Sequence, residues 1–211
     1  MTAAPPDTVL LVHGLWMPAW SLALLARRLR ALGFKTTLFT YPTMAHGLQD
    51  SGRALARRRA AMAAPVVHWV GHSLGGLIIR AAFECEPAQP PGRIVTLGTP
   101  HLGTVAGRAV RRYLGGGILG RGIADLCADI PSQWRPLNRE LGTLAGSKSA
   151  GLGRLFTALP EPNDGTVAAA EAILPSATDH IVLPVSHSGM PFSAEVARHT
   201  AHFLRSGRFD R

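Results

Sequence analysis

The chain has 211 residues, and its balance of 46% hydrophobic against 17% charged residues excludes an intrinsically disordered protein. Its formal net charge is +9, and arginine supplies all but two of the 22 basic residues. No nucleic-acid recognition motif accompanies these scattered arginines. We therefore predict a solvated basic surface and no nucleic-acid partner, with contact to an anionic lipid surface as the alternative.

The same composition limits the compartment and the number of domains. Two cysteines without metal-ligand spacing are too few for a disulfide framework and predict no metal site. The first apolar run, Val9 to Val12, is too short for a signal peptide or a membrane span, so a cytoplasmic location is expected. No repeat or linker divides the chain, which predicts one domain, 1–211.

Apolar, β-branched segments alternate with amphipathic helical segments along the chain, and this alternation predicts a parallel sheet built from βαβ units. Strands are predicted at 8–13, 35–41, 66–70, 93–97, 155–159 and 180–185. Helices are predicted at 18–32, 49–62, 74–85 and 193–204. Residues 99–154 show helical pieces but no strand pattern.

The long segment 102–153 is expected to form a small cap, because insertions after parallel strands overhang the end of the sheet where ligands bind. Two short helices are predicted in it, at 107–114 and 118–130, around the glycines 115–117. One interpretation is a fixed cap that packs on the sheet. The other is a mobile lid with a glycine hinge, whose basic face of Arg108, Arg111 and Arg112 rests on anionic lipid.

Residues 71–75, Gly-His-Ser-Leu-Gly, form a G-x-S-x-G motif between a predicted strand and a predicted helix. Such a turn is strained and crowded, so it needs small residues on both sides of a nucleophile, and Gly71 and Gly75 meet that need. Ser73 would project from the turn as the nucleophile, with the helix N-terminus favouring developing negative charge. The alternative is that Ser73 only caps the helix.

His13-Gly14-Leu15-Trp16 follows the first predicted strand. Acyl transfer needs two N–H donors aimed at the oxyanion, and we expect them at Leu74, directly after the serine, and at Leu15. The His13 side chain is expected to orient this loop rather than to take part in chemistry. Trp16 is predicted to line the acyl pocket, with packing under the first helix as the alternative.

The segments VLLVHG, GHSLGG and LGTPHLGT, in this order and at these gaps, resemble the α/β-hydrolase superfamily and are most similar to small bacterial lipases and esterases. The resemblance covers nearly the whole chain. It implies a mostly parallel central sheet with helices on both faces. Only seven residues precede Thr8, so the first hairpin of larger members is expected to be missing, which leaves about six strands.

The resemblance also implies that an acid and then a histidine follow the serine, each after a later strand. Of the five histidines beyond residue 85, His187 leaves a predicted strand into a loop and is the expected base, whereas His180 opens that strand at the opposite end. Asp164 lies in a D-G-x-V pattern after the predicted strand 155–159 and is the expected acid. Glu161 is the nearest substitute.

These residues predict a serine hydrolase that cleaves small-molecule carboxylic esters through an acyl-enzyme, with no cofactor. The same groups would serve a thioesterase or an acyltransferase, so the reaction class is better defined than the substrate. A protein that keeps the hydrolase fold but only binds a ligand is the alternative from another class. The oligomeric state is not predicted.

Overall fold

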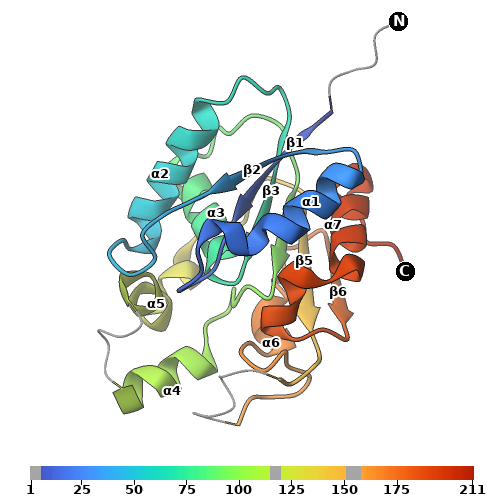
Figure 1. The fold of residues 1–211 in the computed structure, drawn as a ribbon. Helices are drawn as coiled ribbons and strands as arrows, with labels where there is room; N and C mark the ends of the chain where they lie inside the picture. Colours follow the sequence, from blue (N-terminus) through green and yellow to red (C-terminus); the bar gives the residue numbers. More distant parts are fainter. Residues whose placement is uncertain (1–5, 115–119, 151–157) are drawn as a thin grey trace, which may run out of the picture.

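The computed structural model describes residues 6–114, 120–150 and 158–211. Six parallel strands form one twisted sheet in the order β2-β1-β3-β4-β5-β6 (Figure 1). The strands are β1 (Thr8–Val12), β2 (Lys35–Phe39), β3 (Val67–His72), β4 (Ile94–Leu97), β5 (Leu141–Gly146) and β6 (Asp179–Leu183). This confirms the predicted architecture of about six mostly parallel strands.

Helices cover both faces of the sheet, as predicted (Figure 1). One face carries α1 (Ala23–Ala31), which follows the short helix η1 (Ala19–Leu22), and α7 (Ala194–Ser206). The other face carries α2 (Leu48–Ala60) and α3 (Leu74–Cys85). The remaining described helices are α4 (Val105–Leu114), α5 (Gly120–Cys127), η3 (Ile130–Gln133), α6 (Ala169–Ala172) and η5 (His187–Phe192).

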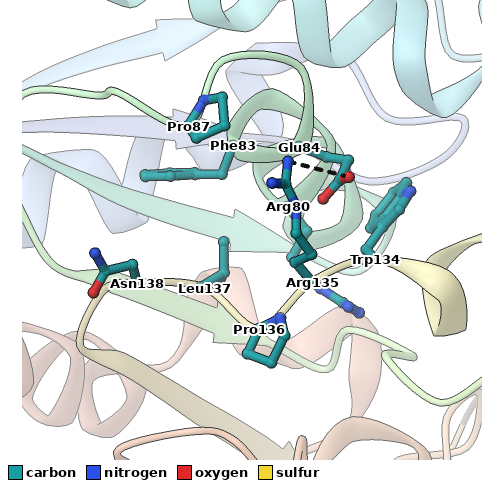
Figure 2. A pocket seen from close by; sticks show the side chains of 9 residues that line it. All are labelled: Arg80, Phe83, Glu84, Pro87, Trp134, Arg135, Pro136, Leu137 and Asn138. Carbon is teal, nitrogen blue, oxygen red and sulfur yellow. Dashed lines mark ion pairs between the residues drawn. The ribbon is translucent and has the colours of Figure 1, made fainter.

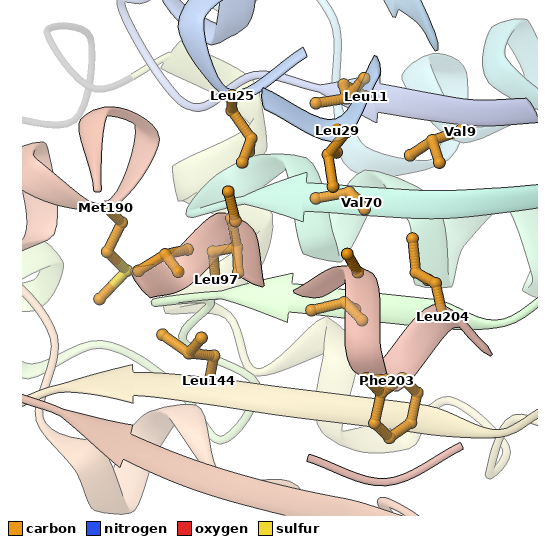
Figure 3. Packing of buried hydrophobic residues seen from close by; sticks show 14 of the residues in the cluster. Val9, Leu11, Leu25, Leu29, Val70, Leu97, Leu144, Met190, Phe203 and Leu204 are labelled. Carbon is orange, nitrogen blue, oxygen red and sulfur yellow. The ribbon is translucent and has the colours of Figure 1, made fainter. Parts of the chain in front are cut away.

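Two hydrophobic cores result from the alternation of side chains along the buried strands. Val9 and Leu11 of β1 belong to the core under α1 and α7, whereas Leu10 and Val12 belong to the core under α2 and α3. Figure 3 shows the first of these cores, with Leu25 and other apolar side chains of both helices packed over the central strands. Burial on both faces explains why β1 is a continuous apolar run.

The fifth strand corrects the sequence analysis. β5 is Leu141–Gly146, inside the segment in which no strand was expected. Of the predicted strand 155–159, residues 155–157 lie outside the described residues, and 158 and 159 are not in a strand. In the sequence LGTLAG only Thr143 is β-branched, and Gly142 lies where a side chain would meet the ring of Phe203 at 2.8 Å. The expected cap 102–153 must therefore end before Leu141.

Both helices predicted in the cap segment are present, although α5 is shorter than expected. The hinge expected at 115–117 lies outside the described residues. α5 is anchored by the fully buried side chain of Leu126, whereas among the described side chains of α4 only Ala106 is buried. Figure 1 accordingly shows α4 at the periphery of the molecule. No helix within the described ranges is long and apolar enough to cross a membrane.

Candidate active site

Ser73 occupies the sharp turn between β3 and α3, with φ of 54° and ψ of −125°. The glycines on either side are required by close backbone approach. A Cβ on Gly71 would lie 2.5 Å from the amide nitrogen of Gly76, and a Cβ on Gly75 would lie 2.2 Å from the carbonyl oxygen of Val12. The Ser73 side chain makes no capping hydrogen bond to α3, so the alternative of a simple helix cap is wrong.

A hydrogen-bonded chain joins Ser73 to the two other residues expected from the sequence. His187 begins η5, directly beyond β6, and its Nε2 lies 3.0 Å from Ser73 Oγ. Its Nδ1 lies 2.8 Å from Asp164 Oδ2. The serine hydroxyl can therefore donate to Nε2 while Nδ1–H donates to the carboxylate, which is the arrangement needed to remove the serine proton.

Asp164 is completely buried, yet its carboxylate is fully occupied by donors. Oδ1 accepts hydrogen bonds from the amides of Thr166 at 2.9 Å and Val167 at 2.7 Å, and Oδ2 faces His187. Three donors stabilise a buried negative charge. The main-chain amide of His187 also donates to the Asp164 carbonyl at 2.9 Å, so Asp164 positions the backbone of His187 as well as its ring.

The rejected candidates lie elsewhere. Glu161 is exposed, and its Oε2 accepts from the amide of Asn163 at 3.2 Å rather than contacting His187. Asp179 and His180 open β6 at the amino end of the sheet, where Asp179 pairs with Arg211. Asp164 follows the sheet as predicted, but the strand before it is β5 rather than 155–159.

The two amides expected to bind an oxyanion flank Ser73. Leu74 is the first residue of α3, and Leu15 lies in the turn beyond β1. That turn lies against Ser73, because a Cβ on Gly14 would lie 3.0 Å from Ser73 Cβ. Neither amide donates to an acceptor within the described part of the chain. Both therefore suit the stabilisation of a developing negative charge.

His13 has the orienting place expected for it. Its buried ring stacks on Tyr41 with centroids 4.6 Å apart, and its Nδ1–H donates to the Gly14 carbonyl at 3.0 Å. The Tyr41 hydroxyl donates to the His13 carbonyl at 2.9 Å. Burial lowers the pKa of His13, which keeps this ring neutral. The loop that carries Leu15 is thus fixed from two sides.

Trp16 does not pack under the first helix. Its side chain is 55% exposed, and its indole Nε1–H donates to the sulfur of Met44 at 3.0 Å. Exposed apolar side chains also occur on other segments that follow the carboxyl ends of strands. This apolar rim consists of Trp16, Trp20, Met44, Leu102, Tyr113 and Phe192.

Two residues next to His187, Gly98 and His72, were not identified as site residues from the sequence. A Cβ on Gly98, whose φ is +56°, would lie 3.0 Å from both Asp164 Oδ2 and His187 Nδ1. The imidazole of His72 lies beneath His187 and contacts its carbonyl. The only local sign of these roles is their position, Gly98 directly after β4 and His72 directly before the serine.

A cavity of about 160 Å³ lies away from this site, between the end of α3 and the segment that leads to β5 (Figure 2). Its buried Arg80 donates to the carbonyls of His101 and Pro131 and lies over the ring of Trp134, 5.3 Å from its centroid. The dashed line in Figure 2 marks the Arg135–Glu84 ion pair at its edge. These contacts give Arg80 a structural role. Among the described residues, no three His, Cys, Asp or Glu side chains gather as metal ligands.

Several solved structures share this fold. The mature form of the lipase BlEst2 from Bacillus licheniformis is 23% identical, with a TM-score of 0.76 over 97% of this chain and 92% of that chain. A carboxyl esterase of metagenomic origin is 18% identical, with a TM-score of 0.67 over 90% and 66% of the two chains. A monoacylglycerol lipase from Paleococcus ferrophilus is 14% identical, with a TM-score of 0.63 over 95% and 94%.

At these identities the likeness establishes the fold alone. No match was found among curated protein sequences. The sequence model of the alpha/beta hydrolase family, in contrast, matches residues 9–208, which is nearly all of the 211 residues. The chain therefore belongs to the alpha/beta hydrolase family, as its sequence motifs predicted.

Proposed function

We propose that the chain is a serine hydrolase that cleaves carboxylic esters of apolar acids. The observation that carries this proposal is the hydrogen-bonded chain from Ser73 through His187 to the buried Asp164. The amides of Thr166 and Val167 hold the Asp164 carboxylate with Oδ2 facing His187 Nδ1, so the imidazole carries its proton on Nδ1 and leaves Nε2 free to accept one from Ser73. The lipase and esterase structures with the same fold agree with this choice.

The reaction proceeds in two halves. In the first, Ser73 Oγ attacks the acyl carbonyl carbon while its proton passes to His187 Nε2, and the amides of Leu15 and Leu74 bind the oxyanion. The tetrahedral intermediate collapses, and His187 gives the proton to the departing alcohol. In the second half a water molecule, deprotonated by His187, attacks the acyl-enzyme and releases the acid. Asp164 stabilises the imidazolium that forms in both halves.

The apolar rim and the arginines of α4 favour a substrate with an apolar acyl group that lies in a lipid surface. The segments of the apolar rim follow the carboxyl ends of strands, as Ser73 and His187 do, so these exposed side chains would contact an apolar acyl group or lipid that approaches the site from this edge. Arg108, Arg111 and Arg112 on α4 are all exposed. Their positive charge would attract an anionic lipid surface, and α4, in which Ala106 is the only buried side chain among those described, would be the moving part of the cap.

The central experiment measures hydrolysis of p-nitrophenyl esters from C2 to C16 by the native chain and by Ser73→Ala. Loss of the nucleophile should lower kcat by about 10³-fold or more and leave the fold intact. The matched control is Ser132→Ala, an exposed serine on η3, which should keep the native rate. If Ser73→Ala retains a tenth of the native rate, the nucleophile is assigned wrongly.

The substrate series also separates the related reactions. A thioesterase or an acyltransferase would also form an acyl-enzyme at Ser73. The thioesterase would hydrolyse thioesters faster than simple esters, and the acyltransferase would transfer the acyl group to an added alcohol faster than to water. A binding protein would do neither.

The lipid contact is tested with vesicles of phosphatidylglycerol or phosphatidylcholine. Arg111→Ala/Arg112→Ala should weaken binding to the anionic vesicles and leave cleavage of a C4 ester unchanged. The double variant Arg57→Ala/Arg58→Ala, on the exposed face of α2, removes the same charge elsewhere and should bind nearly as the native chain does. Equal weakening by both variants would mean that net charge alone attracts the chain. Faster turnover of monomeric than of emulsified esters would indicate an esterase with a fixed cap.

A further inference from the structure

The imidazole of His72, the residue before the proposed nucleophile, lies directly against the proposed base. His72 is 1% exposed, and its ring centroid lies 4.9 Å from that of His187. Its Nε2 lies 3.0 Å from the main-chain carbonyl oxygen of His187. A carbonyl oxygen can only accept, so His72 must carry its proton on Nε2 and donate it there.

With this contact, both main-chain polar groups of His187 are hydrogen-bonded. The amide of His187 donates to the Asp164 carbonyl at 2.9 Å, and its carbonyl accepts from His72. His72 is the last residue of β3 and is covalently joined to Ser73. The hydrogen bond therefore ties the strand that ends at the nucleophile directly to the loop that carries the base, across 115 residues of sequence.

The surroundings of His72 keep this donor in one protonation state. Burial and the neighbouring His187 lower the pKa of His72 to about 3, and Asp164 and His13 are the other titratable groups that act on it. The ring is therefore neutral near pH 7. A neutral ring can donate from Nε2 without adding a second positive charge beside the imidazolium that His187 becomes during acyl transfer.

We infer that His72 is a positioning residue for the proposed reaction, which sets the approach of His187 Nε2 to Ser73 Oγ through its hydrogen bond to the His187 carbonyl. The inference rests on the proposed function, because it assumes that His187 is the base. A displacement of about 1 Å between a base and a nucleophile is enough to cost about 100-fold in rate. His72 is buried, and its hydrogen bond goes to the main-chain carbonyl of His187 rather than to the His187 ring or to Ser73, so it acts through His187.

The test compares two substitutions of similar size. In His72→Gln the amide Nε2 is separated from Cα by as many bonds as the histidine Nε2 and keeps the donor, whereas His72→Leu removes it. We expect His72→Leu to lower kcat for a C4 ester by about 10- to 100-fold with KM within about 2-fold, and His72→Gln to restore most of the rate. In a His187→Ala background, His72→Leu should change the residual rate by less than about 2-fold.

The control is His68→Leu. His68 is a buried histidine near the start of β3, where it contacts Asp7 and the amide of Arg93. This variant should lower stability without changing kcat. If His72→Leu does not fold, His72→Asn replaces it, because its amide is one bond too short to reach the carbonyl.

Three results would overturn the inference. The first is a native kcat in His72→Leu or His72→Asn, and the second is a His72→Gln variant as slow as His72→Leu. The third is a loss of rate on His72→Leu in the His187→Ala background as large as in the native chain. The proposed function fails in a different way. In that case the native chain shows no turnover of esters, and Ser73→Ala and His187→Ala behave as the native chain does.

Discussion

Both oxygens of Asp164 are committed to donors, and this makes the site sensitive to a change of one atom. In Asp164→Asn the amide oxygen would keep the bonds to the amides of Thr166 and Val167, so the new NH₂ group would face His187 Nδ1. The imidazole would then carry its proton on Nε2 and could not accept one from Ser73. We expect kcat for a C4 ester to fall by about 10³- to 10⁴-fold with little change in Tm. A fall of less than about 10-fold would contradict the assignment of the acid.

Gly98 offers a second test at the level of one residue. Its φ is +56°, and an added Cβ would lie 3.0 Å from both Asp164 Oδ2 and His187 Nδ1, so a methyl group there would require these two side chains to shift. Gly33 also has a positive φ, +91°, but the nearest atom to an added Cβ is 3.7 Å away, on Arg205. Both Gly→Ala variants should lose about 1–2 kcal/mol in the free energy of unfolding, measured in urea.

Only Gly98→Ala should also lower kcat, by about 10-fold or more, because its methyl group pushes the acid and the base apart. Unchanged kcat in Gly98→Ala would mean that the pair tolerates displacement.

At this scale, the sequence was sufficient for residues with a local pattern. Ser73 is predicted from the glycines around it, and His187 from its place after a strand in the order that the family resemblance implies. Asp164 is predicted from the same order and its D-G-x-V pattern, although the described strand before it is β5 rather than 155–159. His72 and Gly98 were missed because their contacts are with residues distant in the chain, and no local pattern encodes a hydrogen bond between His72 and the carbonyl of His187.

Among the elements, α5 differs from α4 in how it is held. Asp125 of α5 accepts a hydrogen bond from the amide of Leu48 at 2.8 Å and so caps the start of α2 from another element. Asp125→Ala should therefore lower the free energy of unfolding by about 0.5–2 kcal/mol in urea titrations. Asp210→Ala, which breaks an exposed ion pair with Arg198, is the control and should cost less than about 1 kcal/mol. Equally small losses of unfolding free energy in both variants would mean that the hydrogen bond from Leu48 to Asp125 does not anchor α5.

The bounds of whole elements are predicted correctly where residues that start and end an element stand at both of its ends. The bounds of α3 agree with the expected 74–85, because a glycine-rich turn begins it and Pro87 follows its end. β5 was missed because Gly142, Ala145 and Gly146 weaken its apolar pattern and Thr143 is its only β-branched residue. Its place in the sheet is determined by the strands and by α7 packed against it, which is tertiary information.

For the whole molecule, buried histidines predict a loss of stability in acid. Burial lowers the pKa of His72 to about 3, and burial together with Arg80 lowers the pKa of His101 well below its usual value. In the unfolded chain both titrate near about 6.5. Between these pH values the unfolded state binds protons that the folded state does not, so stability falls as pH falls below about 6.5, by up to about 1.4 kcal/mol per pH unit for each histidine.

The urea midpoint should therefore be nearly constant from pH 8 to 7 and decrease steadily below pH 6. His101→Gln should make this decrease shallower, whatever its effect at pH 8. An equally steep decrease in that variant would show that His101 is not held neutral in the folded state.

The most direct test of the proposed chemistry is covalent labelling of the native chain with a fluorophosphonate, followed by mass spectrometry of the intact protein and of its peptides. A serine whose proton is removed by His187 attacks the phosphorus and displaces fluoride, and the chain loses ester hydrolysis in step with labelling. We predict one adduct per chain, located on Ser73 and absent from Ser73→Ala and His187→Ala. No adduct, or an adduct on another residue with ester turnover unaffected, would contradict the proposal that this chain is a serine hydrolase acting through Ser73.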